Sequence, residues 1–190
     1  MARTRRTAED ARQAILAAAV ELFVDGGYGA TSLDDIAGKV GLTRQAALYH
    51  FRTKEDLLRS VVDPYLQDLT AVLDAVTVHD PPTPAEQRAT LSALVDVLVA
   101  HRGVVSLLSR FTTATTIAGI GPQLAHLTTR IQTLLAGSEL ATDPDLRTRA
   151  HATTAALIGV MAARTEIPLD QPHQRDVLVE AAAAILASTH

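Results

Sequence analysis

Two adjacent side chains in the first quarter of the chain have the chemistry to read DNA bases. Arg44 can donate two hydrogen bonds to guanine, and Gln45 can form two with adenine, if both enter a major groove. Thr43 precedes them and is of a type that caps helix N-termini, so the pair would lie in the first turn of a short helix. A recognition helix contacts base edges from this position.

Residues around this pair have side chains that contact phosphate in protein–DNA complexes. Several stand at predicted helix N-termini, where the helix dipole favours anions. We therefore expect the DNA-contacting residues to be Thr31, Ser32, Thr43, Arg44, Gln45, Ala46, Tyr49, His50 and Lys54. Spacing alone leaves open a three-helix packing unit that binds no nucleic acid.

Residues 31–58 predict two short helices joined by a tight turn, followed by the start of a third helix. The apolar residues of the first helix recur at helical spacing, and Ser32 with Asp35 predicts a capping box at its start. Gly41 can adopt the left-handed conformation that ends this helix. Small Ala37 lets the two helices cross closely, as a helix-turn-helix requires.

Several separated motifs in this region resemble the N-terminal domain of TetR-type transcriptional regulators, the TetR/AcrR family. They are, in order, Ile15-Leu16, Ala18-Ala19, Glu21-Leu22-Phe23, Gly26-Gly27-Tyr28, Ala30-Thr31, Ile36-Ala37, Gly41-Leu42-Thr43, Tyr49-His50-Phe51 and Lys54-Glu55-Asp56-Leu57-Leu58. The resemblance covers about residues 10–60. The chain departs from the family pattern at Leu48, where the family commonly has its tyrosine, and at Gln45, where glycine is common.

The resemblance implies a sequence-specific DNA-binding transcriptional regulator whose homodimer binds a palindromic double-stranded operator. We expect a repressor that leaves the operator when an unidentified small molecule binds its body. A regulator that works without a ligand, or that activates transcription, remains open. An all-helical enzyme is a remote alternative, and we expect none because the sequence contains no recognisable nucleophile–base pair, phosphate loop or carboxylate dyad.

Composition favours an all-α fold. Apolar residues make up 47% of the 190 residues but aromatic residues only 3%, and the prevalence of alanine, leucine and valine suits helix-on-helix packing. We expect about nine helices in two domains, a helix-turn-helix DNA-binding domain at 8–60 and a helical ligand-binding and dimerisation domain at 61–190. The absence of cysteine excludes disulfides and a cysteine nucleophile, and no paired-histidine spacing supports a metal; we expect no metal or cofactor.

The net charge of −4 is unevenly distributed. Residues 1–60 carry nine basic and eight acidic side chains, whereas residues 61–190 carry eight basic and thirteen acidic ones. The basic charge that could bind DNA is therefore confined to the N-terminal third of the chain. Arg3, Arg5 and Arg6 form either a solvated end or an arm that follows the DNA. With no signal peptide and no apolar run of about 18 residues, we expect a cytoplasmic protein without a membrane partner.

Caps and helix breakers predict the remaining helices at residues 8–25, 54–76, 84–101, 104–117, 122–136, 144–164 and 172–188. Pro64 predicts a kink or break near Asp63, a candidate joint between head and body. Thr83 with Glu86 predicts a capping box after a proline-rich linker. Gly103 is expected to separate the helix at 84–101 from the next one.

The last two predicted helices are apolar on more than one face, so they need covering on more than one side. A second copy of the chain is one cover; two fully internal helices are the alternative. The resemblance implies a two-fold dimer with a four-helix bundle. The candidate dimer residues are Ala155, Ala156, Gly159, Val177, Ala181, Ala184 and Ile185.

The other helices of the body could enclose a ligand cavity. Each candidate alone is more typical of a surface residue or of a core residue with satisfied polar groups. The candidates, mostly polar residues on apolar helices, are His101, Arg102, Phe111, Thr112, Thr115, His126 and Met161. Hydroxyl groups with few charges suit a mostly apolar, neutral or anionic small molecule.

Overall fold

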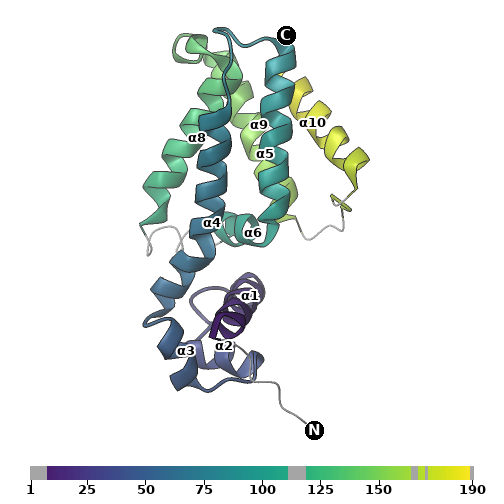
Figure 1. The fold of residues 1–190 in the computed structure, drawn as a ribbon. Helices are drawn as coiled ribbons and strands as arrows, with labels where there is room; N and C mark the ends of the chain where they lie inside the picture. Colours follow the sequence, from purple (N-terminus) through teal and green to yellow (C-terminus); the bar gives the residue numbers. More distant parts are fainter. Residues whose placement is uncertain (1–7, 111–118, 164–166, 170, 189–190) are drawn as a thin grey trace.

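The computed structural model describes residues 8–110, 119–163, 167–169 and 171–188, and every regular element in these ranges is helical (Figure 1). The α-helices are α1 (Ala8–Gly26), α2 (Leu33–Lys39), α3 (Arg44–His50), α4 (Lys54–Ala75), α5 (Pro84–Ala100), α6 (Arg102–Arg110), α8 (Ile120–Ala136), α9 (Pro144–Ala162) and α10 (Pro172–Ala187). One 3₁₀ turn, η1 (Ser138–Ala141), precedes α9. Nine α-helices in the described ranges confirm the expected all-α fold.

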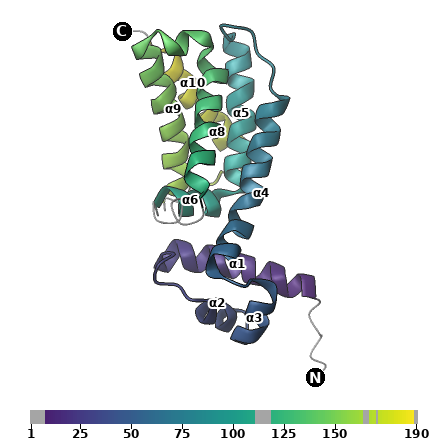
Figure 2. The same ribbon diagram turned by 90° about the vertical axis from the view of Figure 1, so that its left-hand side faces the viewer.

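Helices α1, α2 and α3 form a small head at one end of the molecule (Figures 1 and 2). Its core contains Ile15, Ala19 and Phe23 of α1, all fully buried. The Phe23 ring lies 5.2 Å from that of Tyr28, centroid to centroid, which ties α1 to the loop before α2. These residues therefore form part of the buried face of α1.

Local capping bonds set the ends of the short helices in the head. The Asp35 backbone N–H donates to the Ser32 hydroxyl, and the Asp35 carboxylate accepts from the Ser32 N–H, which completes the predicted capping box of α2. Gly41 has a φ of 71°, the left-handed conformation expected in this turn. The Thr43 hydroxyl accepts the Ala46 N–H and starts α3 at the predicted residue.

Helix α4 begins in the head and ends at the far side of the body, so the expected domain boundary at residue 60 falls inside one helix. Pro64 does not break it: α4 is assigned as continuous over 22 residues, and its axis changes direction near the middle (Figure 1). Pro64 itself is exposed, whereas Val62, Tyr65 and Leu66 beside it are buried. Packing of that face holds the helix together across the lost hydrogen bond.

The body is a bundle of the second half of α4 with α5, α8 and α9, and α10 lies against α5 and α9 (Figures 1 and 2). Helix α6 turns by 86° from α5 and runs across the end of the bundle that faces the head. The break between the two helices lies at His101 and not at Gly103 as expected, because Gly103 is the second residue of α6. The expected extension of this helix to Ile117 lies outside the described residues.

Two helices of the body begin at their expected caps. Asp143 caps α9, and Thr83 with Glu86 forms the predicted capping box of α5, with Pro84 at the first helical position. The Thr83 backbone N–H, followed by the His79 ring and the Thr83 hydroxyl, lowers the pKa of Glu86 to about 2. Helix α8 starts two residues earlier than expected, at Ile120, after Gly119 with a φ of 66°.

Head and body meet where α1 packs against α6. This contact is close because Gly103 has no side chain: a Cβ atom built there would lie 2.8 Å from Cγ1 of Val20. The head is therefore joined to the body both through α4 and across this interface.

Among the described residues, no single helix is both long and apolar enough to cross a membrane; α5 and α6 reach that threshold only as a pair bent by 86°. The same ranges contain no group of three or more histidine, aspartate or glutamate side chains placed to bind a metal ion.

Candidate functional site

Helix α3 presents one face to solvent and one to the head core. Ala47 is fully buried and Phe51, just past the helix, is 3% exposed, so they anchor the inner side. Gln45 and Tyr49 lie one turn apart on the outer side, since residues four apart share a helix face. Tyr49 is 83% exposed, which is unusual for a large aromatic residue on a surface that contacts no other molecule.

Arg44 shares this outer region and is held by a carboxylate. Its Nη1 lies 3.2 Å from Oδ2 of Asp34 on α2, and both side chains are more than half exposed. The ion pair orients Arg44 and leaves most of its guanidinium N–H groups available to other acceptors. Sequence reasoning missed Asp34, because the pair joins two helices and has no short-range sequence signal.

Besides Tyr49, two further expected phosphate-contacting residues, at the two ends of α3, remain accessible. The Thr43 hydroxyl accepts the Ala46 N–H at 3.2 Å and keeps its own proton for another acceptor. The His50 ring is partly exposed and meets the Tyr49 ring edge-on at 5.3 Å. Ser32 is exposed, but its hydroxyl donates to Oδ2 of Asp35 at 2.6 Å, so this donor is already engaged.

The polar groups of Thr31 and Lys54, two of the expected DNA-contacting residues, bind the head's own backbone. The Thr31 hydroxyl is buried and lies 2.9 Å from the carbonyl oxygen of Gly27. The Lys54 ammonium donates to the carbonyl oxygens of Tyr28, at 2.8 Å, and Thr31, at 2.9 Å. These bonds attach the loop before α2 to the start of α4, which is a structural role.

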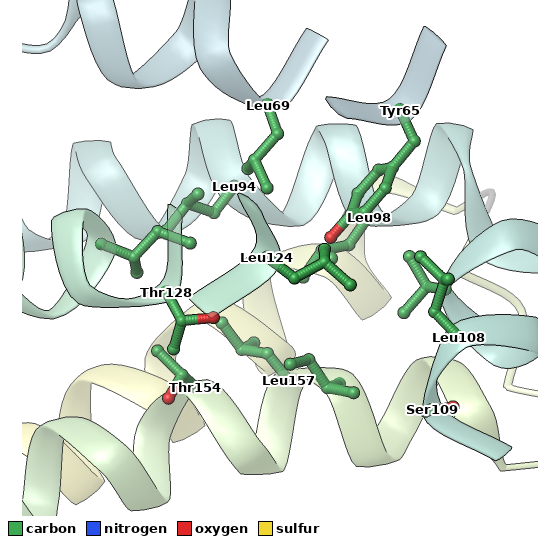
Figure 3. Close-up of a pocket in the computed structure, with 13 residues that line it drawn as sticks. Tyr65, Leu69, Leu94, Leu98, Leu108, Ser109, Leu124, Thr128, Thr154 and Leu157 are labelled. Atoms are coloured by element: carbon green, nitrogen blue, oxygen red, sulfur yellow. The ribbon is translucent and has the colours of Figure 1, made fainter. Parts of the chain in front are cut away.

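The body contains a cavity of about 160 Å³ between α4, α5, α6, α8 and α9 (Figure 3). Aliphatic side chains form most of its wall, and the polar lining residues are Tyr65, Ser109, Thr128 and Thr154. We did not single out Tyr65 from the sequence. A signal was present, since Tyr65 lies four residues from both Val61 and Leu69 on the inward stripe of α4.

None of the described ligand candidates lines this cavity. His101 Nε2 lies 2.7 Å from Oδ2 of Asp68, and Arg102 donates to the carbonyl oxygen of Ile167. His126 is exposed, and Met161 is a core residue with 1% exposure. Phe111, Thr112 and Thr115 lie outside the described residues.

Most of the candidate dimer residues on α9 and α10 are exposed in this chain. Val177 is 50% exposed, and with Tyr49 it makes up the large exposed hydrophobic side chains of the described ranges. The smaller members of the set are Ala155, Gly159, Ala181 and Ala184, which are exposed, and Ala156 and Ile185, which are partly buried. An apolar surface of this kind is typical of one that another protein covers.

Comparison with known proteins assigns the head. The family described as bacterial regulatory proteins, tetR family, matches residues 15–61. The HTH-type transcriptional regulator SrpR of Pseudomonas putida is 46% identical over 60 residues, which are 32% of this chain and 28% of SrpR. The HTH-type transcriptional repressor BepR of Brucella suis is 39% identical over 62 residues, 33% of this chain and 30% of BepR. These alignments therefore span less than a third of either relative.

The fold extends the similarity to the body. The crystal structure of Mycobacterium smegmatis AmtR superposes on 99% of this chain and 90% of its own, with a TM-score of 0.74 and 23% sequence identity. At that identity the likeness concerns the fold. The head sequence at residues 15–61 is therefore that of the tetR family of bacterial regulatory proteins, and the fold of the whole chain is similar to that of AmtR.

Proposed function

We propose that this chain is a homodimeric, sequence-specific DNA-binding transcriptional regulator. The observation that carries the proposal is the outer face of α3, where Arg44, Gln45 and Tyr49 are exposed while Ala47 fixes the helix to its core. Arg44 and Gln45 would form hydrogen bonds with base edges in the major groove, and Thr43, Tyr49 and His50 would contact the flanking phosphates.

Substitution of the two base-reading residues tests this assignment. Duplexes selected from a random pool supply the ligand, and fluorescence anisotropy measures their binding to the full chain. We expect Arg44→Ala and Gln45→Ala each to weaken specific binding by about 1–3 kcal/mol and to relax the selected sequence at one position.

A matched control for Arg44 is Arg88, an arginine of the body with a similarly exposed side chain that also forms one ion pair, with Glu180. Arg88→Ala removes the same charge far from α3 and should leave the selected sequence unchanged. Equal losses for Arg44→Ala and Arg88→Ala would mean that only total charge matters, and the base-reading role would be abandoned.

The proposed dimer uses the open surface of α9 and α10. Small residues there let two copies approach closely, and a dimer would present two α3 helices to successive major grooves about 34–36 Å apart. In sedimentation velocity, Ala181→Arg should shift the protein towards a monomer, because a long charged side chain would be buried without a partner. Ala71→Arg on the exposed side of α4 is the control. A dimer that tolerates Ala181→Arg would place the interface elsewhere.

We further propose that the protein is a repressor released by a small molecule in the body. Support comes from α4, which contributes Tyr65 and Leu69 to the cavity and starts in the head. A ligand that favours one position of this helix would change the separation of the two heads. BepR is named a repressor, in line with this direction of control. In a reporter with a selected operator over the promoter, expression should fall with the protein; a rise would identify an activator.

A further inference from the structure

The cavity in the body has a wall chemistry that narrows the class of molecule it can take. It is formed by aliphatic side chains from five helices, among them Leu94, Leu98, Leu124 and Leu157. No charged side chain among the described residues lines it. An ionised guest would lose its hydration there without gaining a counter-ion, which is strongly unfavourable.

Two hydroxyl groups in this wall lack partners, whereas the other two are satisfied. Ser109 donates to the carbonyl oxygen of Ser106, and Thr154 donates to the carbonyl oxygens of Ala150 and His151. Within the described part of the chain, neither Tyr65 nor Thr128 forms a side-chain hydrogen bond. Their hydroxyls are therefore the polar contacts that the wall offers to a guest.

Tyr65 is the stronger of the two contacts. Tyr65 is only 5% exposed. Figure 3 shows its hydroxyl pointing away from α4 into the space near Leu98 and Leu124. Burial raises the pKa of Tyr65 to about 12, so the phenol stays neutral and can donate or accept a hydrogen bond. The hydroxyl lines the cavity without a protein partner, and a guest with one polar atom could form a hydrogen bond with it.

The volume limits the size of the guest. An apolar cavity of about 150 Å³ is large enough to hold benzene. The volume of about 160 Å³ thus accommodates one six-membered ring with a small substituent.

We propose that this cavity binds a neutral, largely apolar molecule about the size of a single ring, with one hydroxyl or carbonyl group hydrogen-bonded to Tyr65. The inference rests on the proposed function, since it names the chemical class of the effector. It also narrows the sequence-based expectation, which allowed an anionic molecule.

Isothermal titration calorimetry on the full chain without DNA tests the proposal with four probes of similar shape. Benzyl alcohol is the neutral probe with a polar group, toluene lacks that group, and benzoate and benzylamine carry opposite charges. We expect benzyl alcohol to bind, toluene to bind more weakly, and both charged probes to bind at least about tenfold more weakly than benzyl alcohol. Tighter binding of either ion, or no binding of benzyl alcohol at millimolar concentration, would overturn the proposal.

Tyr65→Phe locates the bound molecule, because it removes the hydroxyl and keeps the ring that packs in the core. Its affinity for benzyl alcohol should fall about two- to tenfold, the range of one neutral hydrogen bond, while toluene binding stays unchanged. Tyr28→Phe in the head is the control, since it alters a buried tyrosine far from the cavity. An unchanged affinity of Tyr65→Phe for benzyl alcohol would place the probe elsewhere and refute the assignment.

Anisotropy with a selected duplex separates this inference from the proposed function. If duplexes bind but no neutral probe does, the cavity assignment fails and DNA binding stands. If benzyl alcohol binds in a Tyr65-dependent way but no duplex is selected, DNA binding fails and the cavity assignment stands.

Discussion

The contact between α1 and α6 makes a quantitative prediction about the head–body joint. In Gly103→Ala the new Cβ would lie 2.8 Å from Cγ1 of Val20, about 0.7–1.2 Å closer than ordinary carbon–carbon contact. Overpacking of this kind costs about 1–3 kcal/mol, and the better helix propensity of alanine offsets up to about 1 kcal/mol. We therefore expect a net destabilisation of about 1–2 kcal/mol, which lowers the melting temperature by roughly 2–8 °C.

A double-mutant cycle with Val20→Ala isolates the steric cause. Removing the two methyl groups of Val20 clears the space, so Gly103→Ala should become neutral or slightly stabilising in that background. Gly38→Ala, also in a helix but with no atom within 4 Å of the new Cβ, should be stabilising on its own. Urea unfolding of the parent protein, Gly103→Ala, Val20→Ala and the double variant gives the coupling energy between the two positions. If Gly103→Ala destabilises equally with and without Val20, the two helices do not meet as described.

Three further predictions concern single contacts. Asp34→Asn should raise affinity for selected duplexes up to about fivefold in anisotropy, because it frees Arg44 and removes a charge that repels phosphate; unchanged affinity would mean that the ion pair does not compete with DNA. Gly137 and Gly41 share a φ of 71°, but only at Gly137 would an added Cβ meet residues 80–82, at 2.5–3.2 Å. In urea unfolding, Gly137→Ala should therefore lose about 1–3 kcal/mol more unfolding free energy than Gly41→Ala. Equal losses would refute this contact. The lowered pKa of Glu86 implies stability that is present above about pH 4.5 and is lost as the pH falls towards 2. Glu86→Gln should remove that dependence in denaturation series, and an unaltered pH profile would contradict the capping geometry.

Local rules were sufficient where a short stretch determines its own conformation. Ser32, Thr43 and Thr83 cap the predicted helices because side-chain oxygen and backbone N–H lie within three residues of one another. Gly41 takes a left-handed conformation for an equally local reason. The all-α class followed from composition and periodicity, and the head was identifiable because its motifs occur in order.

Pro64 shows where local rules fail. It removes one backbone hydrogen bond, which predicted a kink or a break near Asp63; α4 changes direction near its middle but does not break, because the buried residues on either side are held by other helices. The same kind of long-range contact holds the Lys54 ammonium, whose partners are backbone carbonyl groups 26 and 23 residues away.

The sequence by itself determined the all-α class, the caps of α2, α3 and α5, and the place of Arg44 and Gln45 in the first turn of α3. Only the tertiary structure decided which side chains meet across helices. It placed Arg44 beside Asp34 and brought α6 into close contact with α1 at Gly103. It also placed Tyr65 in the wall of a cavity that none of the described sequence-based candidates lines. The physical reason is that capping and turn formation involve neighbours along the chain, whereas a cavity or an ion pair depends on how separate helices pack, which no local pattern encodes.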